Sequence, residues 1–265
     1  MKTVRIDSID GIKELVFEQR RNEQNGRYRS SYMYRGLSNA AFRLETSLKR
    51  NCGDLSETLE MHILENFLKY ASLEDPTLND SVWKAMIIGQ HHGLPTRLLD
   101  WTPSTLVALH FALTESNMSW MDKTDCAVWR IDIREMNKRL PAKYRKVLED
   151  NKTSLYNIDQ FTGVVGSIEE YDSDMNADAF IVVEPPSIDQ RIVNQYSFFS
   201  IIPRGMDDLD GFLESMENSV KYVISKDLRW DLRDILDQMN MNERIIYPGL
   251  DGIARWIGRH YYVKR

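Results

Sequence analysis

Alternating apolar and polar positions predict β-strands in six segments of the chain. The clearest is residues 126–133, where apolar side chains recur at every second position, as a strand with one buried face requires. In another segment Tyr32 and Tyr34 take alternate positions, which turns Arg35 toward the opposite face of the strand. The six predicted strands cover residues 32–36, 96–101, 126–133, 180–184, 196–202 and 220–224.

Apolar residues that repeat at helical spacing predict the helices. One helix follows a short opening strand, and another begins near Asp54, where Glu57 completes a capping box. A third carries Met86 and ends at His91 and His92. Three more are predicted: one with Thr102 as N-cap and Pro103 at its first position, one capped by Ser225, and one near residues 250–257. Residues 134–175 are predicted to be polar and irregular, with about two short helices.

Strands dispersed among helices predict a single α+β domain over residues 1–265. No internal repeat, low-complexity tract or linker interrupts the pattern. At 265 residues the chain is long enough to bury a substantial core. We therefore expect one mixed sheet flanked by helices, with the corner at residues 90–102 lining a cleft.

Composition narrows the class of protein. Hydrophobic residues make up 42% of the chain and charged residues 28%, as in ordinary globular proteins. The 34 basic residues against 40 acidic ones give a net charge of −6, which argues against purely electrostatic attraction to nucleic acid. The only cysteines, Cys52 and Cys126, match no metal-ligand spacing. Without a signal peptide or a long apolar run, we expect a cytoplasmic protein with no membrane partner.

Side chains that could take part in binding or catalysis are most concentrated in residues 89–102. This stretch reads Gly-Gln-His-His-Gly-Leu-Pro-Thr-Arg-Leu-Leu-Asp-Trp-Thr, so titratable, aromatic and chain-bending side chains follow one another closely. Each buried polar group needs a hydrogen-bond partner, which makes such a density costly in a plain core segment. The stretch therefore favours a functional site. The alternative is a structural corner whose polar groups satisfy one another.

Familiar catalytic motifs are absent from the sequence. It contains no GxxxxGK[ST], no GxGxxG after a strand, no HExxH and no GxSxG. A metal site of His91, His92 and Asp100 is disfavoured, because adjacent histidines point in divergent directions. An Asp100–His92 pair with a nearby hydroxyl nucleophile stays open, as does a structural ion pair of Asp100 with Arg97 or a histidine.

Several blocks of sequence carry a family resemblance. They are Tyr34-Arg35-Gly36, Phe42-Arg43-Leu44 with Ser47-Leu48, residues 90–102, Ser104 to Ala112, Arg191 with Gln195 and Phe198 or Phe199, and residues 247–252. Together they resemble the FRG domain, named for a Phe-Arg-Gly motif in which Tyr34 here replaces the phenylalanine. The resemblance covers residues 30–258.

The order of the segments is also similar to ADP-ribosyltransferases. This second resemblance implies a mixed, ADP-ribosyltransferase-like β core and NAD as the substrate. It gives Arg35 the bidentate clamp on the diphosphate, Thr102 a supporting role, and Gln195 the hydrogen bond to the nicotinamide ribose. Gln195 stands where many such enzymes carry glutamate, and an amide cannot act as a base. We expect Gln195→Glu to keep or raise NAD cleavage.

The same resemblance assigns the remaining candidate residues. Asp100 would activate the acceptor, so Arg35, Asp100 and Gln195 form the candidate catalytic set. Tyr34, His92 or Trp101 would stack on nicotinamide or adenine. The expected NAD-binding residues are Tyr34, Gly36, His92, Thr96, Arg97, Trp101 and Thr102.

Three functions are compatible with these assignments. The first is an enzyme that transfers ADP-ribose from NAD to an intracellular macromolecule (RNA, DNA or protein), as the toxin of a toxin–antitoxin or phage-defence system with an antitoxin partner. The second is a noncatalytic nucleotide- or nucleic-acid-binding module that uses the same cleft. The third is a His/Asp-dependent hydrolase or nuclease. Arg35 and residues 90–102 serve all three.

Overall fold

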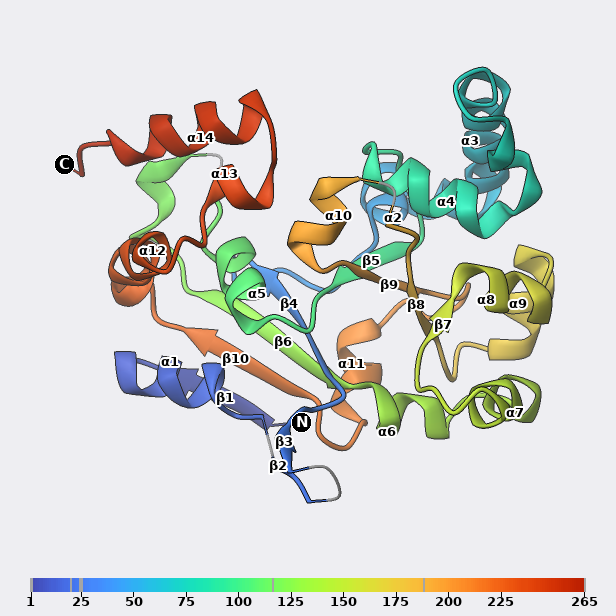
Figure 1. The fold of residues 1–265 in the computed structure, drawn as a ribbon, viewed down its shortest axis with the longest axis horizontal. Helices are drawn as coiled ribbons and strands as arrows, with labels where there is room; N and C mark the ends of the chain where they lie inside the picture. Colours follow the sequence, from blue (N-terminus) through green and yellow to red (C-terminus); the bar gives the residue numbers. More distant parts are fainter. Residues whose placement is uncertain (1, 20, 24–25, 116, 188, 265) are drawn as a thin grey trace.

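The computed structural model describes residues 2–19, 21–23, 26–115, 117–187 and 189–264 (Figure 1). Its first four-stranded sheet has the order β1 (Lys2–Ile6), β10 (Val220–Ile224), β6 (Cys126–Asp132) and β4 (Tyr32–Leu37). β1 and β10 run parallel, whereas β10–β6 and β6–β4 are antiparallel. The sheet is thus mixed, as predicted.

A second four-stranded sheet has the order β5 (Leu98–Trp101), β9 (Phe198–Ile201), β8 (Ile181–Glu184) and β7 (Tyr156–Asn157). Only β7 and β8 are parallel in it. A small hairpin joins β2 (Arg21–Asn22) to β3 (Arg27–Tyr28). All six predicted strands are present, but the expected single sheet is wrong, because alternation locates a strand without fixing its neighbours.

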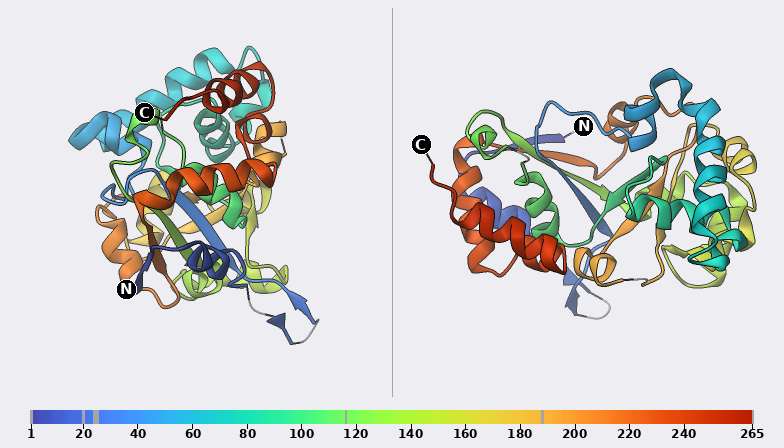
Figure 2. Two further views of the ribbon diagram at one scale, coloured as in Figure 1. Left: turned by 90° about the vertical axis from the view of Figure 1, so that its left-hand side faces the viewer. Right: turned by 90° about the horizontal axis from the view of Figure 1, so that it is seen from above.

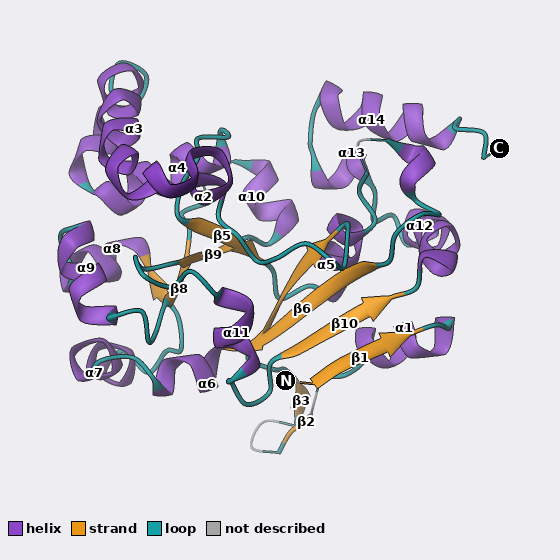
Figure 3. Ribbon diagram, turned by 180° about the vertical axis from the view of Figure 1, so that it is seen from behind, coloured by secondary structure: helices purple, strands orange, loops and turns teal. Residues whose placement is uncertain are grey.

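The two sheets meet at one β-bridge. Tyr34 N donates to Thr102 O at 2.7 Å, and Thr102 N donates to Tyr34 O at 2.9 Å. Figure 3 shows the two sheets from behind, with helices on their outer faces. The bridge fixes the middle of β4 against the end of β5, although these strands lie more than 60 residues apart in the chain.

Three apolar cores hold the layers together. One packs α1 (Ile9–Val16), α5 (Thr105–Ala112) and α12 (Arg229–Gln238) on the first sheet. Another packs α4 (Val82–His91), α7 (Ala142–Asp150), α8 (Ile158–Val164) and α9 (Ile168–Met175) on the second sheet. The third lies between the sheets and includes side chains of α6 (Ile133–Lys138) and α11 (Leu209–Glu214).

The other helices lie around these layers. They are α2 (Ser47–Cys52), α3 (Ser56–Ala71), α10 (Gln190–Gln195), α13 (Glu243–Ile246) and α14 (Leu250–His260), with 3-10 turns at Gly53–Leu55, Pro76–Asp80, Met118–Trp120 and Lys226–Leu228. Seen from above in Figure 2, α12 to α14 lie at one end of the molecule and α3 at the other. No helix of the described ranges has the length and apolar character needed to cross a bilayer.

Two predicted helix caps are wrong. α3 begins at Ser56, its N-cap Leu55 makes no side-chain hydrogen bond, and Asp54 lies in the preceding 3-10 turn. At α5 the cap is Ser104, whose Oγ accepts from Val107 N, whereas Thr102 Oγ1 accepts from Ser104 N. The helix starts later than predicted because Thr102 is held by the bridge to β4.

Two segments hold more helix than predicted. Four helices, α6 to α9, occupy the region 134–175 that the sequence indicated as irregular. Its hydrophobic positions are too sparse to form long stripes, yet short helices bury Tyr144, Phe161 and Tyr171 completely. Gln195 is the last residue of α10, and the strand begins only at Phe198, because Tyr196 adopts a left-handed conformation (φ 48°).

Candidate functional site

A cavity of about 470 Å³ lies beside the bridge between the two sheets. Its volume falls within the range of small-molecule sites. Seven of the ten predicted site residues line it: Tyr34, Arg35, Gly36, Asp100, Trp101, Thr102 and Gln195. The other lining residues are Leu37, Ser38, Phe42, Arg43, Glu45, Arg50, Ala108, Phe111, Thr114, Arg191 and Ser197. We call this the large cavity.

Arg35 connects the two sheets inside the large cavity. Its Nη1 donates to Asp100 O at 2.8 Å and to Asp100 Oδ2 at 3.3 Å. Its Nε is buried and has no hydrogen-bond partner among the described residues. Burial lowers the pKa of this guanidinium, with Arg50 adding to the effect and Asp100 opposing it. Arg35 therefore has hydrogen-bonding capacity left for an anion.

Asp100 is an exposed partner for Arg35. Half of its side chain is accessible (51%), and Gln90 Nε2 also donates to its Oδ2, at 3.3 Å. The ion pair considered with Arg97 or a histidine is thus formed with Arg35 instead. Because both contacts end on Oδ2, Oδ1 is the oxygen we regard as able to accept a proton.

Two residues of the Tyr-Arg-Gly motif have structural explanations. The Tyr34 hydroxyl donates to Glu18 Oε1 at 2.7 Å, and the side chain is fully buried. A Cβ at Gly36 would lie 2.0 Å from Ala108 O, so only glycine lets α5 pack this closely on β4. These two residues place Arg35 at the cavity rather than contacting a ligand through their own chemistry.

Trp101 and Thr102 also have structural roles in the wall of the large cavity. Trp101 Nε1 donates to Ser200 Oγ at 2.9 Å, which leaves its ring buried (2% exposed) and not free to stack as predicted. Thr102 carries the β-bridge and is buried. Its support of the site acts through the backbone.

Gln195 is held by α13. Its Nε2 donates to Ile246 O at 3.1 Å, and Asn194 Nδ2 donates to Ile245 O at 2.7 Å. This orientation of the amide leaves Oε1 to accept a hydrogen bond in the cavity. A carboxylate at this position cannot donate to the Ile246 carbonyl, so Gln195→Glu would lose this hydrogen bond.

Three predicted ligand-binding residues do not line the large cavity: His92, Thr96 and Arg97. His92 is the exposed C-cap of α4. Thr96 is buried, and its Oγ1 donates to Gln90 Oε1 at 2.7 Å. The buried Arg97 pairs with Glu60 and Asp172, with Nε 2.6 Å from Glu60 Oε1. Thr96 and Arg97, but not the exposed His92, thus form the self-satisfied corner that was the alternative for residues 89–102.

The two adjacent histidines take separate roles. His91 Nε2 pairs with Asp189 Oδ2, and burial lowers the pKa of His91 although Asp189 opposes that effect. Within the described ranges, no group of three or more His, Cys, Asp or Glu side chains is arranged to hold a metal ion. The structure thus separates His91 from Asp100, which pairs with Arg35.

Sequence reasoning missed three arginines of the large cavity. Arg43 Nη2 contacts Asp208 Oδ1 at 2.7 Å, and Arg50 Nη1 donates to Glu45 O. Arg191 Nη1 donates to His91 O at 3.3 Å, while its Nε is buried without a hydrogen-bond partner in the described chain. Arg43 and Arg191 occur in the sequence blocks that resemble the FRG domain, so that resemblance could have identified them as site residues. Nothing in the sequence marks Arg50, on α2, as a site residue.

The lining of the large cavity is electropositive. Four arginines face two carboxylates, Asp100 and Glu45, in a chain whose overall net charge is −6. Phe111 adds an aromatic ring to the lining, and behind it lies the Tyr247 ring, 6.4 Å from Phe111 between centroids and 5.4 Å from Arg191 Cζ. Positive charge beside aromatic rings suits an anionic ligand with a planar group.

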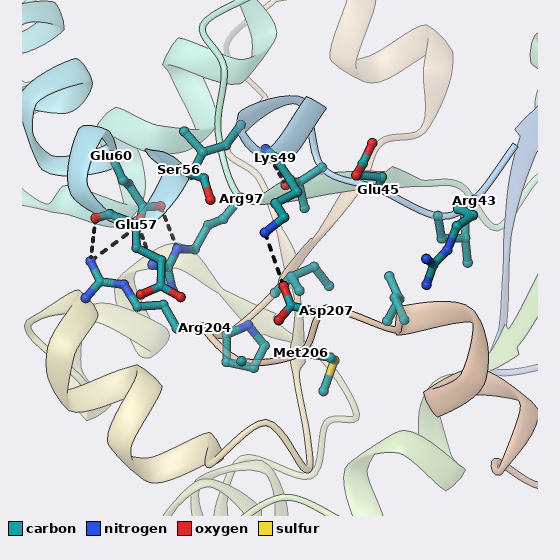
Figure 4. A pocket seen from close by; sticks show the side chains of 17 residues that line it. Arg43, Glu45, Lys49, Ser56, Glu57, Glu60, Arg97, Arg204, Met206 and Asp207 are labelled. Carbon is teal, nitrogen blue, oxygen red and sulfur yellow. Dashed lines mark hydrogen bonds and ion pairs between the residues drawn. The ribbon is translucent and has the colours of Figure 1, made fainter. Parts of the chain in front are cut away.

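A second, smaller cavity of about 110 Å³ shares Arg43 and Glu45 with the large one. Figure 4 shows Arg97 and Arg204 turned toward Glu60 and Lys49 turned toward Asp207, whereas Arg43 and Glu45 lie apart from them. Lys49 Nζ lies 3.4 Å from Asp207 Oδ1, and Arg204 Nε lies 3.5 Å from Asp172 Oδ2. Arg97 completes the lining with its pair to Glu60. We call this the small cavity.

Comparison with known proteins finds a family model that matches part of the chain. The family model described as the FRG domain matches residues 30–120, so this segment of the chain is similar to the FRG domain. The matched segment supplies β4, residues 42–50, the end of β5 and α5, whereas α10 completes the large cavity from outside it. No curated protein and no solved structure matches the chain.

Proposed function

We propose that the large cavity binds NAD and that the protein transfers ADP-ribose from NAD to an intracellular macromolecule. The main support is that Arg35, Asp100 and Gln195, which come from three distant segments of the chain, line one electropositive cavity. Arg35 Nε and Arg191 Nε are buried there without hydrogen-bond partners in the described chain. Both residues line the cavity, and a guanidinium group binds a diphosphate through paired hydrogen bonds.

Each lining residue has a role in this proposal. Arg35 and Arg191 bind the diphosphate, while Gln195 Oε1 accepts a hydrogen bond from a ribose hydroxyl. The bond between nicotinamide and ribose C1′ breaks with its electron pair leaving on nicotinamide. The oxocarbenium-like ribose is stabilised by the diphosphate and by the Asp100 carboxylate.

The acceptor completes the reaction. Its nucleophilic atom bonds to C1′ and gives its proton to Asp100 Oδ1. A protein that modifies an essential macromolecule in this way would be toxic to its own cell, so we include a toxin role with an inhibiting antitoxin in the proposal. The acceptor is RNA, DNA or protein.

The test is incubation of the protein with NAD labelled in the adenylate and with cell lysate. We expect released nicotinamide and labelled macromolecule, and digestion with protease or nuclease then identifies the acceptor class. NAD binding without nicotinamide release would support the noncatalytic module instead. Absence of NAD binding at millimolar concentration would overturn the proposal.

Asp100→Asn separates binding from chemistry. This nearly isosteric change removes the proton acceptor, so transfer should fall by about a hundredfold or more. It also removes a negative charge beside the diphosphate, so NAD affinity should stay the same or rise. Equal rates of transfer in the wild type and the variant would exclude Asp100 as the base.

A further inference from the structure

Helix α14 attaches to the molecule through its polar face. Arg259 Nη1 lies 2.7 Å from Asp237 Oδ2, and its Nε lies 2.7 Å from Glu243 Oε1. Arg255 Cζ lies 5.0 Å from the centroid of the Tyr247 ring. A surface helix ordinarily turns its apolar stripe to the core and its charges to water. In α14 this arrangement is reversed.

The outward face of α14 is an apolar stripe. Its exposed fractions are 82% at Leu250, 38% at Ile253, 43% at Ile257 and 77% at Tyr261, just after the helix. Ala254 and Gly258 are also exposed. These positions recur at intervals of three and four, so they lie on one face. We call them the α14 stripe: Leu250, Ile253, Ala254, Ile257, Gly258 and Tyr261.

Gly258 is unexplained by the chain's own packing. A Cβ added there meets nothing within 4 Å, whereas a Cβ at Gly252 would lie 1.7 Å from Tyr247 O. Gly252 is therefore required by the fold. A glycine inside a helix costs about 1 kcal/mol relative to alanine. Gly258 thus leaves room for another helix to approach this face closely.

The stripe is complementary to itself. Ala254 and Gly258 form its small edge, and Ile253 and Ile257, on the other side of the stripe, form its large edge. In an antiparallel pair related by a two-fold axis, each edge meets the same edge of the second copy. The small edges then allow close approach of the helices, while the isoleucines interdigitate.

Charge also favours this antiparallel arrangement. Asp251 lies in the first turn of α14 and His260 in its last turn, whereas Lys264, beyond the helix, lies 3.4 Å from Asp122 Oδ1. No charged residue interrupts the stripe. Antiparallel pairing brings the acidic end of one helix to the basic end of the other and opposes the two helix dipoles. A parallel pair would place like ends together.

We infer that two copies of the chain associate through the α14 stripe in an antiparallel pair. The helix has 11 residues and so is about 16 Å long. Such a face falls short of the roughly 800 Å² per partner of a standard interface. The dimer is therefore weak, with a dissociation constant in the micromolar range, and forms as protein concentration rises.

Sedimentation equilibrium of the full chain from low to high micromolar concentration tests this inference. We expect a reversible monomer–dimer equilibrium in the wild type. Ile257→Asp should weaken it at least roughly tenfold, because it places a carboxylate in the apolar contact. Leu73→Asp is the matched control, since Leu73 is 84% exposed and far from α14, and it should leave the equilibrium unchanged.

Gly258→Leu gives the sharper test. In the monomer the new side chain points into open space and improves helix propensity, so the melting temperature should hold or rise. In the dimer it wedges the small edges apart, so association should fall at least roughly tenfold. A wild type that stays monomeric throughout would overturn the inference, and so would a Gly258→Leu variant that dimerises as well as the wild type.

Discussion

The large and small cavities lie on either side of the segment that carries Arg43 and Glu45, and both are rich in charge. In the small cavity the buried Arg97 is paired with two carboxylates. In the large cavity Arg35 has one exposed carboxylate partner and an unpaired Nε. The comparison teaches that density of charge does not by itself mark a binding site; the two cavities differ in how fully carboxylates compensate the charge of the buried arginine.

The two arginines respond oppositely to their surroundings. Burial opposes the charge of Arg97, but the hydrogen bonds and charges of Glu60 and Asp172 outweigh it and raise its pKa. Burial lowers the pKa of Arg35, because Asp100 compensates only in part. A ligand anion in the large cavity would supply the missing compensation, and the small cavity needs none.

The largest expected effect is on stability, at Arg97. Arg97→Ala leaves Glu60 buried (2% exposed) without this partner, so the free energy of unfolding should fall by about 3–5 kcal/mol. Urea denaturation measures it. A loss below about 1 kcal/mol would mean that the small cavity is not a structural ion-pair site.

Gly36→Ala tests whether a wall residue of the large cavity is structural. The added methyl group would meet the backbone of α5 at Ala108 O, so unfolding free energy should fall by about 1–3 kcal/mol or more. Gly163→Ala is the matched control, because nothing lies within 4 Å of a Cβ there. Equal stability of the two variants would show that Gly36 is retained for ligand contact rather than for packing.

Gln195→Glu has a smaller predicted cost. The carboxylate would face Ile246 O without a proton to donate, so stability should fall by about 1–3 kcal/mol. Thermal unfolding above pH 6, with the carboxylate ionised, checks this. If the variant is as stable as the wild type and cleaves NAD faster, position 195 has the role that glutamate has in many ADP-ribosyltransferases.

The strands and the two sequence segments that form most of the site could be predicted from the sequence. Which strands pair with one another and which side chains contact one another could not. Alternation placed β4 and β6 closely, and the Tyr-Arg-Gly motif with residues 90–102 located most of the large cavity. Which residue satisfies Arg97 depends on α3 and α9, which approach it only in the folded chain. Arg50 and the orientation of Gln195 depend on tertiary packing for the same reason.

Gly36 and Trp101 show a further limit of sequence reasoning. Both occur in motifs that suggest ligand contact, yet the close approach of Ala108 and the hydrogen bond to Ser200 explain them within the fold. A motif shows which residue type a position requires, but not whether that residue is needed for packing or for ligand binding. The contacts of each side chain in the structure distinguish the two.

The most direct test of the account compares Arg35→Lys with Arg204→Lys, one arginine from each cavity, by calorimetric titration with NAD. Lysine keeps the charge but loses the planar fork, so Arg35→Lys should weaken NAD binding about ten- to a hundredfold at an unchanged melting temperature. Arg204, whose charge is paired with Asp172, should tolerate the change with NAD affinity equal to that of the wild type. Full NAD affinity in a stably folded Arg35→Lys variant would contradict the central claim that the large cavity is the binding site.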